Sequence, residues 1–508
     1  MFDPEQLWPQ PRSVVVRGEM APPKALRLER APGAFSLRAG RAEELRRIAR
    51  VEVTDERGAY PLALIRTELP GTLPGSYELS VTPEGASIRA SDAAGAEYGM
   101  ETLLQAVALA GPGSPWPLLT IADSPQYRTR CFMVDLGRSV FPLRMLERIV
   151  RILARLKMNQ LHLHLHDDEL CGIRYPGLPF GEENPFALSV DELARLVRYA
   201  ASYHVEVVPE LEAWGHVGSL TYHRPELRGG EGMYQGASFL ISEGSFGLVE
   251  SLLDRLVPAL AERSTVHLGL DEAQWFCSDE LGGGFTPERM VGRYHDLLRE
   301  VGRRHGRELT LRLWADHAGR PVPESIRPQV IIEPWQYWIA QREAIDKAIE
   351  RYSAGPTPWI MGAGQSSQEF RGAYHATRYW CRRAAGSPGV QGVNVTFWGS
   401  NDLARNLITL FSGAFWAWNP LASSSHASVD DYEMYDRAVF PIMRRWQLLF
   451  PDAYPDDMLR DQGPEVSFGY YVWGERHGEP VAPTAPLALT TGTLDYLHRR
   501  PARWKEPG

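Results

Sequence analysis

Two adjacent carboxylates, Asp271 and Glu272, follow an apolar run that begins at Ser264 and has the composition of a buried β-strand. Neighbouring side chains on a regular strand point to opposite faces, so both carboxylates can enter one pocket only if the strand ends there in a loop. Standing alone, the pair would also fit a helix cap or a solvated turn. Paired carboxyl groups at a strand end favour glycosidic-bond chemistry, in which one protonates the leaving oxygen and a second anion stabilises positive charge on the sugar carbon.

Three earlier segments carry polar residues in the same way, each at the end of a predicted strand. They are Asp135–Ser139, His162–Asp168 and Pro209–His216. The carboxyl ends of the strands of a parallel barrel open at one mouth, so we expect these segments to meet the carboxylate pair there. The side chains expected in this shared site are Arg138, Asp167, His216, Asp271 and Glu272.

Strand and helix patterns alternate regularly through the middle of the chain, which predicts an α/β fold with a (β/α)8 TIM barrel. The predicted strands are Cys131–Leu136, Gln160–His164, Val205–Pro209, Val266–Leu270, Leu309–Leu313, Val330–Glu333, Trp359–Gly362 and Gly392–Phe397. The predicted helices are Leu143–Leu156, Val190–Tyr203, Phe246–Leu260, Glu288–His305, Ile339–Tyr352, Gln368–Arg383 and Leu403–Ala417. A glycine-rich connection, Glu210–Glu243, is longer than an ordinary barrel loop and is interpreted as a lid or a subsite wall.

The segments on either side of the barrel differ from it in pattern. Short alternating runs at Tyr77–Val81 and Ala86–Ala90 precede a helical stretch at Ala94–Leu109, which predicts a small α+β domain. We therefore expect three parts: an α+β domain over residues 1–124, the barrel over residues 125–420, and an extension of unknown role over residues 421–508.

The composition argues against several classes of partner. A net charge of −9 and a pI near 5.9, with scattered basic residues, leave no electrostatic footprint for nucleic acid or an anionic membrane. The N-terminus lacks a basic region followed by an apolar one, so we expect a cytoplasmic protein with no membrane association. Four separated cysteines without CxxC spacing argue against a zinc knuckle or a disulfide framework.

The ordered motifs resemble those of family 20 glycoside hydrolases, the β-N-acetylhexosaminidases. The resemblance rests on Asp135–Arg138, Asn159–Asp168, Pro209–His216 and His267–Glu272, and it extends from about Tyr77 to Trp418. It implies a retaining, exo-acting hydrolase that releases terminal β-linked N-acetylhexosamine (GlcNAc or GalNAc) from a glycoside or oligosaccharide without a cofactor. In this family the 2-acetamido oxygen of the sugar attacks the anomeric carbon and forms an oxazolinium intermediate, an exception to the two-carboxylate scheme.

The resemblance also implies roles for individual residues. Glu272 would be the general acid and then the base, and Asp271 would bind the acetamido N–H. Asp167 and His216 would orient Glu272, and Arg138 would hold sugar hydroxyls. Further substrate-binding residues would be His164, Trp314, Trp335, Tyr337 and Trp398. The alternating His162, His164 and His166 share one strand face, and the resemblance suggests that the first two are buried hydrogen-bonding groups.

The sequence departs from the family pattern at several positions. Leu270 stands where a glycine is usual, His166 where a small residue or threonine is usual, and Glu212 where aspartate is usual. Ser400 stands at or near the position of a carboxylate that grips outer sugar hydroxyls, with Asp402 or Glu333 as possible substitutes. Tyr337 is the candidate for the tyrosine that donates to the acetamido oxygen. These differences favour an altered sugar specificity at the −1 subsite as the main alternative.

Two other classes fit parts of the pattern. A metal-dependent amidohydrolase would use His162, His164, His216, His267 and Asp271 as ligands, but its His-x-His belongs on the first strand and it needs a lysine near the site. A sugar-binding barrel without catalysis would explain Ser400, whereas an intact Asp271-Glu272 pair argues against it.

Overall fold

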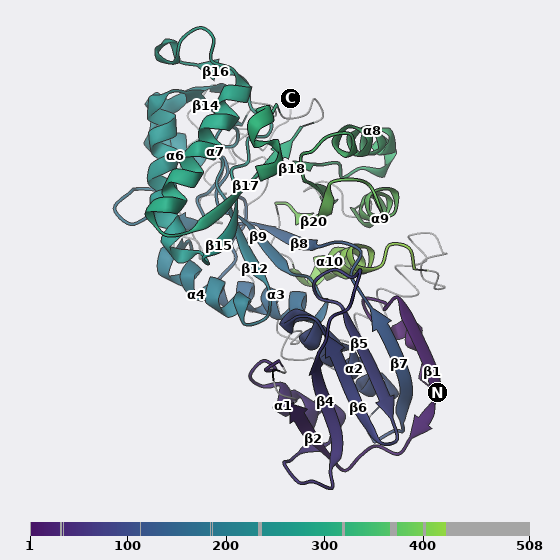
Figure 1. Cartoon of the computed structure of the whole chain (residues 1–508). Helices are drawn as coiled ribbons and strands as arrows, with labels where there is room; N and C mark the ends of the chain where they lie inside the picture. Colours follow the sequence, from purple (N-terminus) through teal and green to yellow (C-terminus); the bar gives the residue numbers. More distant parts are fainter. Residues whose placement is uncertain are drawn as a thin grey trace, which may run out of the picture.

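The computed structural model describes residues 2–422 except 31, 32, 34, 112, 183, 185, 232–235, 317–320, 366–372 and 400–402. The sequence folds into a small α+β domain followed by a closed barrel (Figure 1). The predicted fold class, a TIM barrel preceded by an α+β domain, is confirmed. Most of the expected C-terminal extension, together with Ser400 and Asp402, lies outside the described residues.

The N-terminal domain is a seven-stranded mixed sheet in the order β1-β7-β5-β6-β4-β2-β3, with helix α2 (Ala93–Ala110) against one face. Asp92 caps α2 by accepting from the Gly95 N–H. A Cβ at Gly95 would lie 2.3 Å from the Ser76 carbonyl oxygen, so glycine allows the helix to approach the sheet. The strands are β1 Ser13–Met20, β2 Ala25–Arg30, β3 Glu52–Val53, β4 Tyr60–Arg66, β5 Tyr77–Thr82, β6 Gly85–Ala90 and β7 Trp116–Asp123. A short helix α1 (Arg41–Glu44) lies between β2 and β3.

The barrel closes through parallel pairs in the order β12-β15-β17-β18-β19-β20-β8-β9, with β9 pairing back onto β12. Its strands are β8 Thr129–Asp135, β9 Gln160–His164, β12 Glu206–Glu210, β15 Arg263–His267, β17 Glu308–Ala315, β18 Val330–Pro334, β19 Trp359–Gln365 and β20 Val390–Phe397. Additional short strands are β10 Ile173–Arg174, β11 Leu188–Ser189, β13 Arg228–Glu231, β14 Ala237–Ile241 and β16 Phe276–Cys277. The last three form a small sheet in the order β13-β14-β16 within the long connections after β12 and β15.

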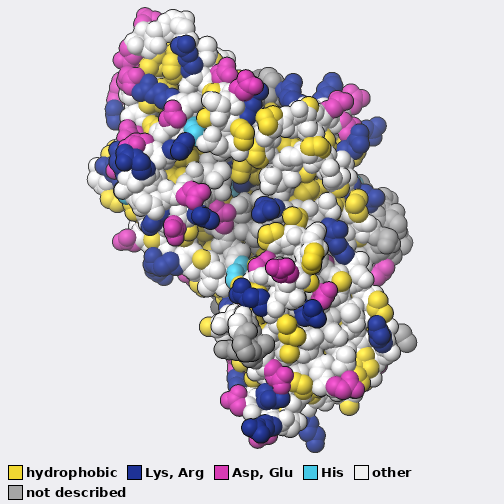
Figure 2. Space-filling model, viewed as in Figure 1, with side chains coloured by type: hydrophobic (Ala, Val, Ile, Leu, Met, Phe, Trp, Pro, Cys, Tyr) yellow, Lys and Arg dark blue, Asp and Glu magenta, His cyan; other side chains and the backbone are white. Residues whose placement is uncertain are grey.

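Helices surround the barrel strands (Figure 1). Buried apolar side chains of these helices join those of the strands in one core. They are α3 Leu143–Arg155, α4 Val190–Ala201, α6 Glu243–Leu256, α7 Pro287–Arg304, α8 Arg342–Ser353, α9 Ala373–Arg383 and α10 Leu403–Trp418. The short helix α5 Gly218–His223 instead contacts β14 in the long connection after β12. Among the described helices, none is both long and apolar enough to cross a membrane. The cytoplasmic location stays a prediction. Figure 2 shows acidic and basic side chains interspersed on the visible face, in keeping with the scattered charges of the sequence.

The predicted strand that leads to the carboxylate pair ends well before its expected end. The prediction Val266–Leu270 was wrong at its end, because β15 stops at His267. Gly269 and Leu270 adopt φ values of +61° and +77°, which lie in the left-handed region and cannot continue a strand. The apolar character of Leu268 and Leu270 reflects burial at the barrel mouth and not strand conformation.

Buried charges join the two domains. At the end of β7, Asp123 contacts the Lys157 ammonium at 3.1 Å, just after α3. The same carboxylate accepts hydrogen bonds from the Tyr77 hydroxyl at 2.7 Å and from Trp418 Nε1 at 2.9 Å, at the end of α10. A second buried ion pair joins Arg155 of α3 to Glu101 of α2 at 3.0 Å. Both sets of contacts tie barrel helices to the N-terminal domain.

Replacement of Asp123 tests whether this ion pair stabilises the domain interface. Asp123→Ala leaves the Lys157 ammonium buried without its carboxylate, so we expect a loss of about 3–5 kcal/mol in the free energy of unfolding. Urea denaturation monitored by tryptophan fluorescence measures the loss. Adding Lys157→Met to Asp123→Ala removes the unpaired buried ammonium and should recover part of the lost free energy of unfolding. Equal free energies of unfolding for wild type and Asp123→Ala would show that the Asp123–Lys157 ion pair does not stabilise the interface.

Candidate active site

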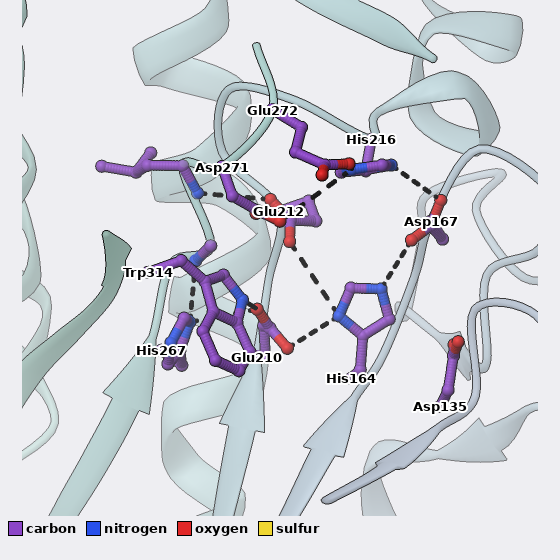
Figure 3. A network of polar contacts seen from close by, with 12 residues as sticks. Asp135, His164, Asp167, Glu210, Glu212, His216, His267, Asp271, Glu272 and Trp314 are labelled. Carbon is purple, nitrogen blue, oxygen red and sulfur yellow. Dashed lines mark hydrogen bonds and ion pairs between the residues drawn. The ribbon is translucent and has the colours of Figure 1, made fainter. Parts of the chain in front are cut away.

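The ends of four neighbouring barrel strands bring their polar side chains together at one mouth (Figure 3). Asp167 follows β9, His216 follows β12, and Asp271 with Glu272 follows β15. Arg138, beyond the end of β8, joins them through an ion pair with Asp167. The five residues expected to share a site are therefore neighbours in the structure.

Left-handed backbone conformations direct the two adjacent carboxylates into the same pocket. Leu270 before Asp271 has φ +77° and Glu272 after it has φ +47°, so the alternation of a regular strand is lost on both sides of Asp271. Gly215 lies against this turn, and a Cβ there would be 2.1 Å from the Asp271 carbonyl oxygen. His216, which follows Gly215, also has a positive φ, +52°. Such conformations are costly for residues other than glycine and persist only where surrounding contacts impose them.

His216 joins Glu272 to Asp167. Its Nε2 lies 3.1 Å from Glu272 Oε2 and 3.9 Å from Asp271 Oδ2, while its Nδ1 lies 3.3 Å from Asp167 Oδ1. Burial opposes the charged form of the imidazole, but Asp167, Asp168 and Glu272 together raise the pKa of His216 well above its usual range. The imidazole is therefore favoured as a cation, which can donate from Nδ1 toward Asp167 and from Nε2 toward Glu272.

The polar chain continues from Asp167 into the barrel. Asp167 Oδ2 accepts from His164 Nε2 at 2.8 Å, and His164 Nδ1 lies 2.7 Å from Glu210 Oε2. Burial disfavours a cation here, yet Glu210 and Asp167 raise the pKa of His164 to about 10. His164 is 1% exposed and lies beneath the pocket with both ring nitrogens engaged. Its contact with substrate stays a prediction.

Glu210 is the centre of the buried network. His162 Nε2 lies 3.0 Å and His267 Nδ1 lies 3.1 Å from oxygens of Glu210, and Trp314 Nε1 donates to this carboxylate. Burial lowers the pKa of His162 to about 3 and that of His267 to about 4, so both rings are neutral at pH 7. One carboxylate thus orients two neutral imidazoles and one imidazolium.

The Arg138 guanidinium is buried among carboxylates. It contacts Asp135 Oδ2 at 3.1 Å, Asp167 Oδ2 at 2.6 Å and Glu169 Oε2 at 3.6 Å. Although burial disfavours the anion, Arg138 and then His216 keep the pKa of Asp167 well below its usual range. Arg138 therefore stabilises the ionised form of Asp167, and its contact with sugar hydroxyls stays a prediction.

Asp271 and Glu212 are buried carboxyl groups whose ionised forms are disfavoured. Burial, opposed by His216 and reinforced by Asp316 and Glu272, raises the pKa of Asp271 to about 7. Burial and then Asp271 raise the pKa of Glu212 well above its usual range, so Glu212 is neutral. Glu212 Oε2 accepts from the Leu270 N–H at 3.3 Å and thereby supports the turn that carries Asp271.

Aromatic side chains from three strand ends lie together beside the carboxylates. Trp314, Trp335 and Tyr337 form one buried cluster, against which Trp398 packs. Trp335 stacks on Tyr337 with ring centroids 5.5 Å apart, and Trp398 Nε1 donates to the Tyr337 hydroxyl at 2.9 Å. The four aromatic residues expected to contact a sugar are thus close together, and Trp314 is the deepest of them.

Sequence reasoning gave no role to two residues of the network, Glu210 and Asp168. Both lie within the motifs that it used. In the register between β12 and β9, Glu210 lies opposite His164, so placing the two motifs on adjacent parallel strands predicts their contact. Asp168 follows the predicted strand in a turn, and its contacts depend on the path of a long connection that no strand pattern determines.

The amidohydrolase alternative required histidines as metal ligands. In the described part of the chain, several such groups lie close together, including His162-Glu210-His267 and His216-Asp271-Glu272. A histidine binds a metal through an unprotonated nitrogen, whereas His164 and His216 have raised pKa values. His162 Nδ1 accepts from the Asn394 side-chain amide at 3.0 Å, so the proton of the neutral ring is on Nε2, which lies 3.0 Å from Glu210. The donor set fits hydrogen bonding better than metal binding.

Comparison with known protein families gives two matches. The catalytic domain of glycosyl hydrolase family 20 matches residues 127–368, and domain 2 of the same family matches residues 5–124. The chain is 33% identical over 194 residues to a β-hexosaminidase of Akkermansia muciniphila, covering 35% of this chain and 39% of that protein. It is 30% identical over 281 residues to a β-N-acetylhexosaminidase of Cellulomonas fimi, covering 50% and 54%. The matches span about half or less of the length of these relatives.

Solved structures share the fold. Flavobacterium johnsoniae chitobiase aligns with a TM-score of 0.70 and 18% identity, over 90% of this chain and 75% of that one. A mutant Streptomyces plicatus β-hexosaminidase in complex with its product GlcNAc aligns with a TM-score of 0.64 and 21% identity, over 89% and 96% of the two chains. At such identities the likeness establishes the fold alone.

The raised pKa of His164 predicts how stability depends on pH. Its folded pKa of about 10 exceeds the usual value of 6.5, so its contribution is complete below about pH 6.5 and is lost as the pH rises through about 10. Wild type should therefore lose more of its free energy of unfolding between about pH 7 and about pH 9 than His164→Gln does. Urea denaturation at several pH values measures both. Parallel pH profiles would mean that His164 is not the buried cation.

Proposed function

The chain belongs to glycosyl hydrolase family 20, and we propose that it is a retaining, exo-acting β-N-acetylhexosaminidase that cleaves terminal β-linked N-acetylhexosamine from glycosides. The observation that carries this proposal is the placement of Asp271 and Glu272 on one side of His216, with His216 Nε2 3.9 Å and 3.1 Å from their oxygens. Two carboxyl groups that share one imidazole and have different surroundings can take different protonation roles.

Glu272 is the proton donor and acceptor of the proposed reaction. A general acid must carry a proton near neutral pH, release it to the leaving oxygen, and later take a proton from water. The contact with His216 supports both steps, because Nε2 and Glu272 Oε2 lie 3.1 Å apart, close enough for a proton to pass between them. Asp167, held ionised by Arg138, keeps the other ring nitrogen oriented.

Asp271 acts on the sugar's own acetamide. In its ionised form the carboxylate accepts the acetamido N–H and offsets the positive charge that develops as the acetamido oxygen attacks the anomeric carbon. Its position next to the aromatic cluster supports this role, because the flat faces of Trp335, Tyr337 and Trp398 suit the apolar faces of a sugar and an acetamide. The Tyr337 hydroxyl is the donor proposed for the acetamido oxygen.

A panel of aryl β-glycosides tests the function. If the acetamide is the nucleophile, the 2-acetamido-2-deoxy-β-glucoside should be cleaved several orders of magnitude faster than the 2-hydroxy analogue, because a positioned internal nucleophile replaces a bimolecular attack. Comparing kcat/KM for the gluco and galacto epimers then measures specificity at C4. Equal cleavage of the 2-acetamido and 2-hydroxy substrates would rule out participation of the acetamide.

Replacement of Glu272 tests the general acid. Glu272→Gln should reduce kcat/KM, which reports the step that expels the leaving group, roughly 10²- to 10⁴-fold on an aryl glycoside with a poor leaving group. The loss should be much smaller with a dinitrophenyl leaving group, which needs little protonation to depart. Glu250→Gln, a half-exposed carboxylate on α6, is the matched control and should keep wild-type rates on both substrates. Equal losses on both substrates would show that Glu272 does not protonate the leaving group.

A further inference from the structure

Asp168 connects the candidate active site to the long segment that follows β12. Its Oδ1 accepts hydrogen bonds from the Gly218 N–H at 2.9 Å, at the start of α5, and from the Ala237 N–H at 2.8 Å, at the start of β14. A single carboxylate oxygen therefore fixes two points of this segment, the start of α5 and the start of β14. The residue is 6% exposed, so these hydrogen bonds are shielded from water.

The second oxygen of the same carboxylate faces the catalytic imidazole. Asp168 Oδ2 lies 3.3 Å from His216 Nδ1. Gly236 packs closely over this contact, and a Cβ there would lie 2.3 Å from Asp168 Oδ2 and 3.5 Å from His216 Nδ1. A side chain at position 236 would separate the carboxylate from the ring, so the backbone of the connection encloses the contact.

The charged and titratable groups around His216 come from several elements. From the β9 loop, Asp167 and Asp168 each lie 3.3 Å from Nδ1. Arg138 Nη2, from the β8 loop, lies 3.4 Å from the same nitrogen. Glu272 and Asp271, from the β15 loop, face Nε2 at 3.1 Å and 3.9 Å, and Glu212 lies within electrostatic range. Arg138 repels a proton on Nδ1 and partly neutralises the negative charge of Asp167. Asp168 supplies a second negative charge beside the same nitrogen and offsets this effect.

We propose that Asp168 is a positioning residue, which uses one oxygen to anchor the β12–β14 connection and the other to hold His216 protonated on Nδ1 with Nε2 directed at Glu272. The catalytic consequence rests on the proposed function, whereas the effect on His216 does not. Asp167 contacts the His216 ring from one side of Nδ1, and Asp168, the next residue of the turn, adds a second contact to the same nitrogen. The proton on Nδ1 stays in place while Nε2 exchanges its proton with Glu272.

Asp168→Asn separates the two roles of the side chain. The amide oxygen can still accept from the Gly218 and Ala237 N–H groups, so the connection stays anchored, while the negative charge beside Nδ1 is lost. An opposite charge within about 4–6 Å commonly raises the pKa of a cation by 1–3 units. We therefore expect the pKa of His216 to fall by about one unit in Asp168→Asn. Nitrogen-15 NMR of histidine-labelled protein measures this pKa, and His216→Asn assigns the signal.

The neighbouring buried carboxyl provides the matched control. Glu169 lies in the same turn and faces Arg138 instead of His216, so Glu169→Gln should leave the His216 titration unchanged. Asp168→Ala removes the anchor as well as the charge and should lower the melting temperature more than Asp168→Asn does. An unchanged His216 pKa in Asp168→Asn, or an equal shift in Glu169→Gln, would overturn the proposal.

Kinetics distinguish failure of this inference from failure of the proposed function. If both hold, Asp168→Asn should shift the alkaline limb of kcat/KM to lower pH by about the shift found by NMR, with a larger loss for poor leaving groups than for a dinitrophenyl leaving group. A wild-type enzyme that cleaves no β-N-acetylhexosaminide would refute the function and leave the NMR result to decide the role of Asp168. An active Asp168→Asn with the wild-type pH profile would refute the catalytic role of Asp168 alone.

Discussion

Alternation of charge along a buried chain is the constraint on which the site depends. A single ion placed in a protein interior is costly, and it is retained only where opposite charges and hydrogen bonds surround it. Glu210, His164 and Asp167 follow one another as anion, cation and anion, with contacts of 2.7 Å and 2.8 Å. His216 continues the order toward Glu272. The ionisation state of each group depends on its neighbours. The loss of any one of these side chains therefore changes the pKa values of the others.

The fold that holds these charged side chains was largely predictable. Parallel barrel strands are buried on both faces, so they appear in the sequence as short apolar runs between helical patterns. Gln160–His164 has the same bounds in the prediction and in the structure. The end of β15 was not predictable from apolar character, since Leu268 and Leu270 are buried in a left-handed turn that resembles a strand in sequence. Strand ends are decided by backbone conformation, and only Gly269 gave a local signal there.

The candidate site was predictable in its membership and less so in its contacts. Motif order placed Asp167, His216 and Glu272 at one mouth, because the ends of parallel strands meet there. The enclosure of Arg138 by three carboxylates was not predictable, since it depends on how the turn after β9 folds back on the β8 loop. Glu169 enters that enclosure from a position with no periodic signal. Such contacts arise between loops, where sequence patterns carry little information about direction.

The buried Asp271 and Glu212 carboxyl groups give the pocket a further property. The binding of a ligand to Asp271 is coupled to the release of a proton from it. The pKa of Asp271 is raised to about 7, and burial is the main cause. A ligand that offers an N–H to this carboxylate stabilises the anion, so its binding near pH 7 displaces part of a proton into solvent. By linkage, a more alkaline solution strengthens the binding of such a ligand until Asp271 is fully ionised. The buried carboxyl pair thus makes the affinity of the pocket for an amide depend on the acidity of the surroundings, even for a ligand that carries no charge.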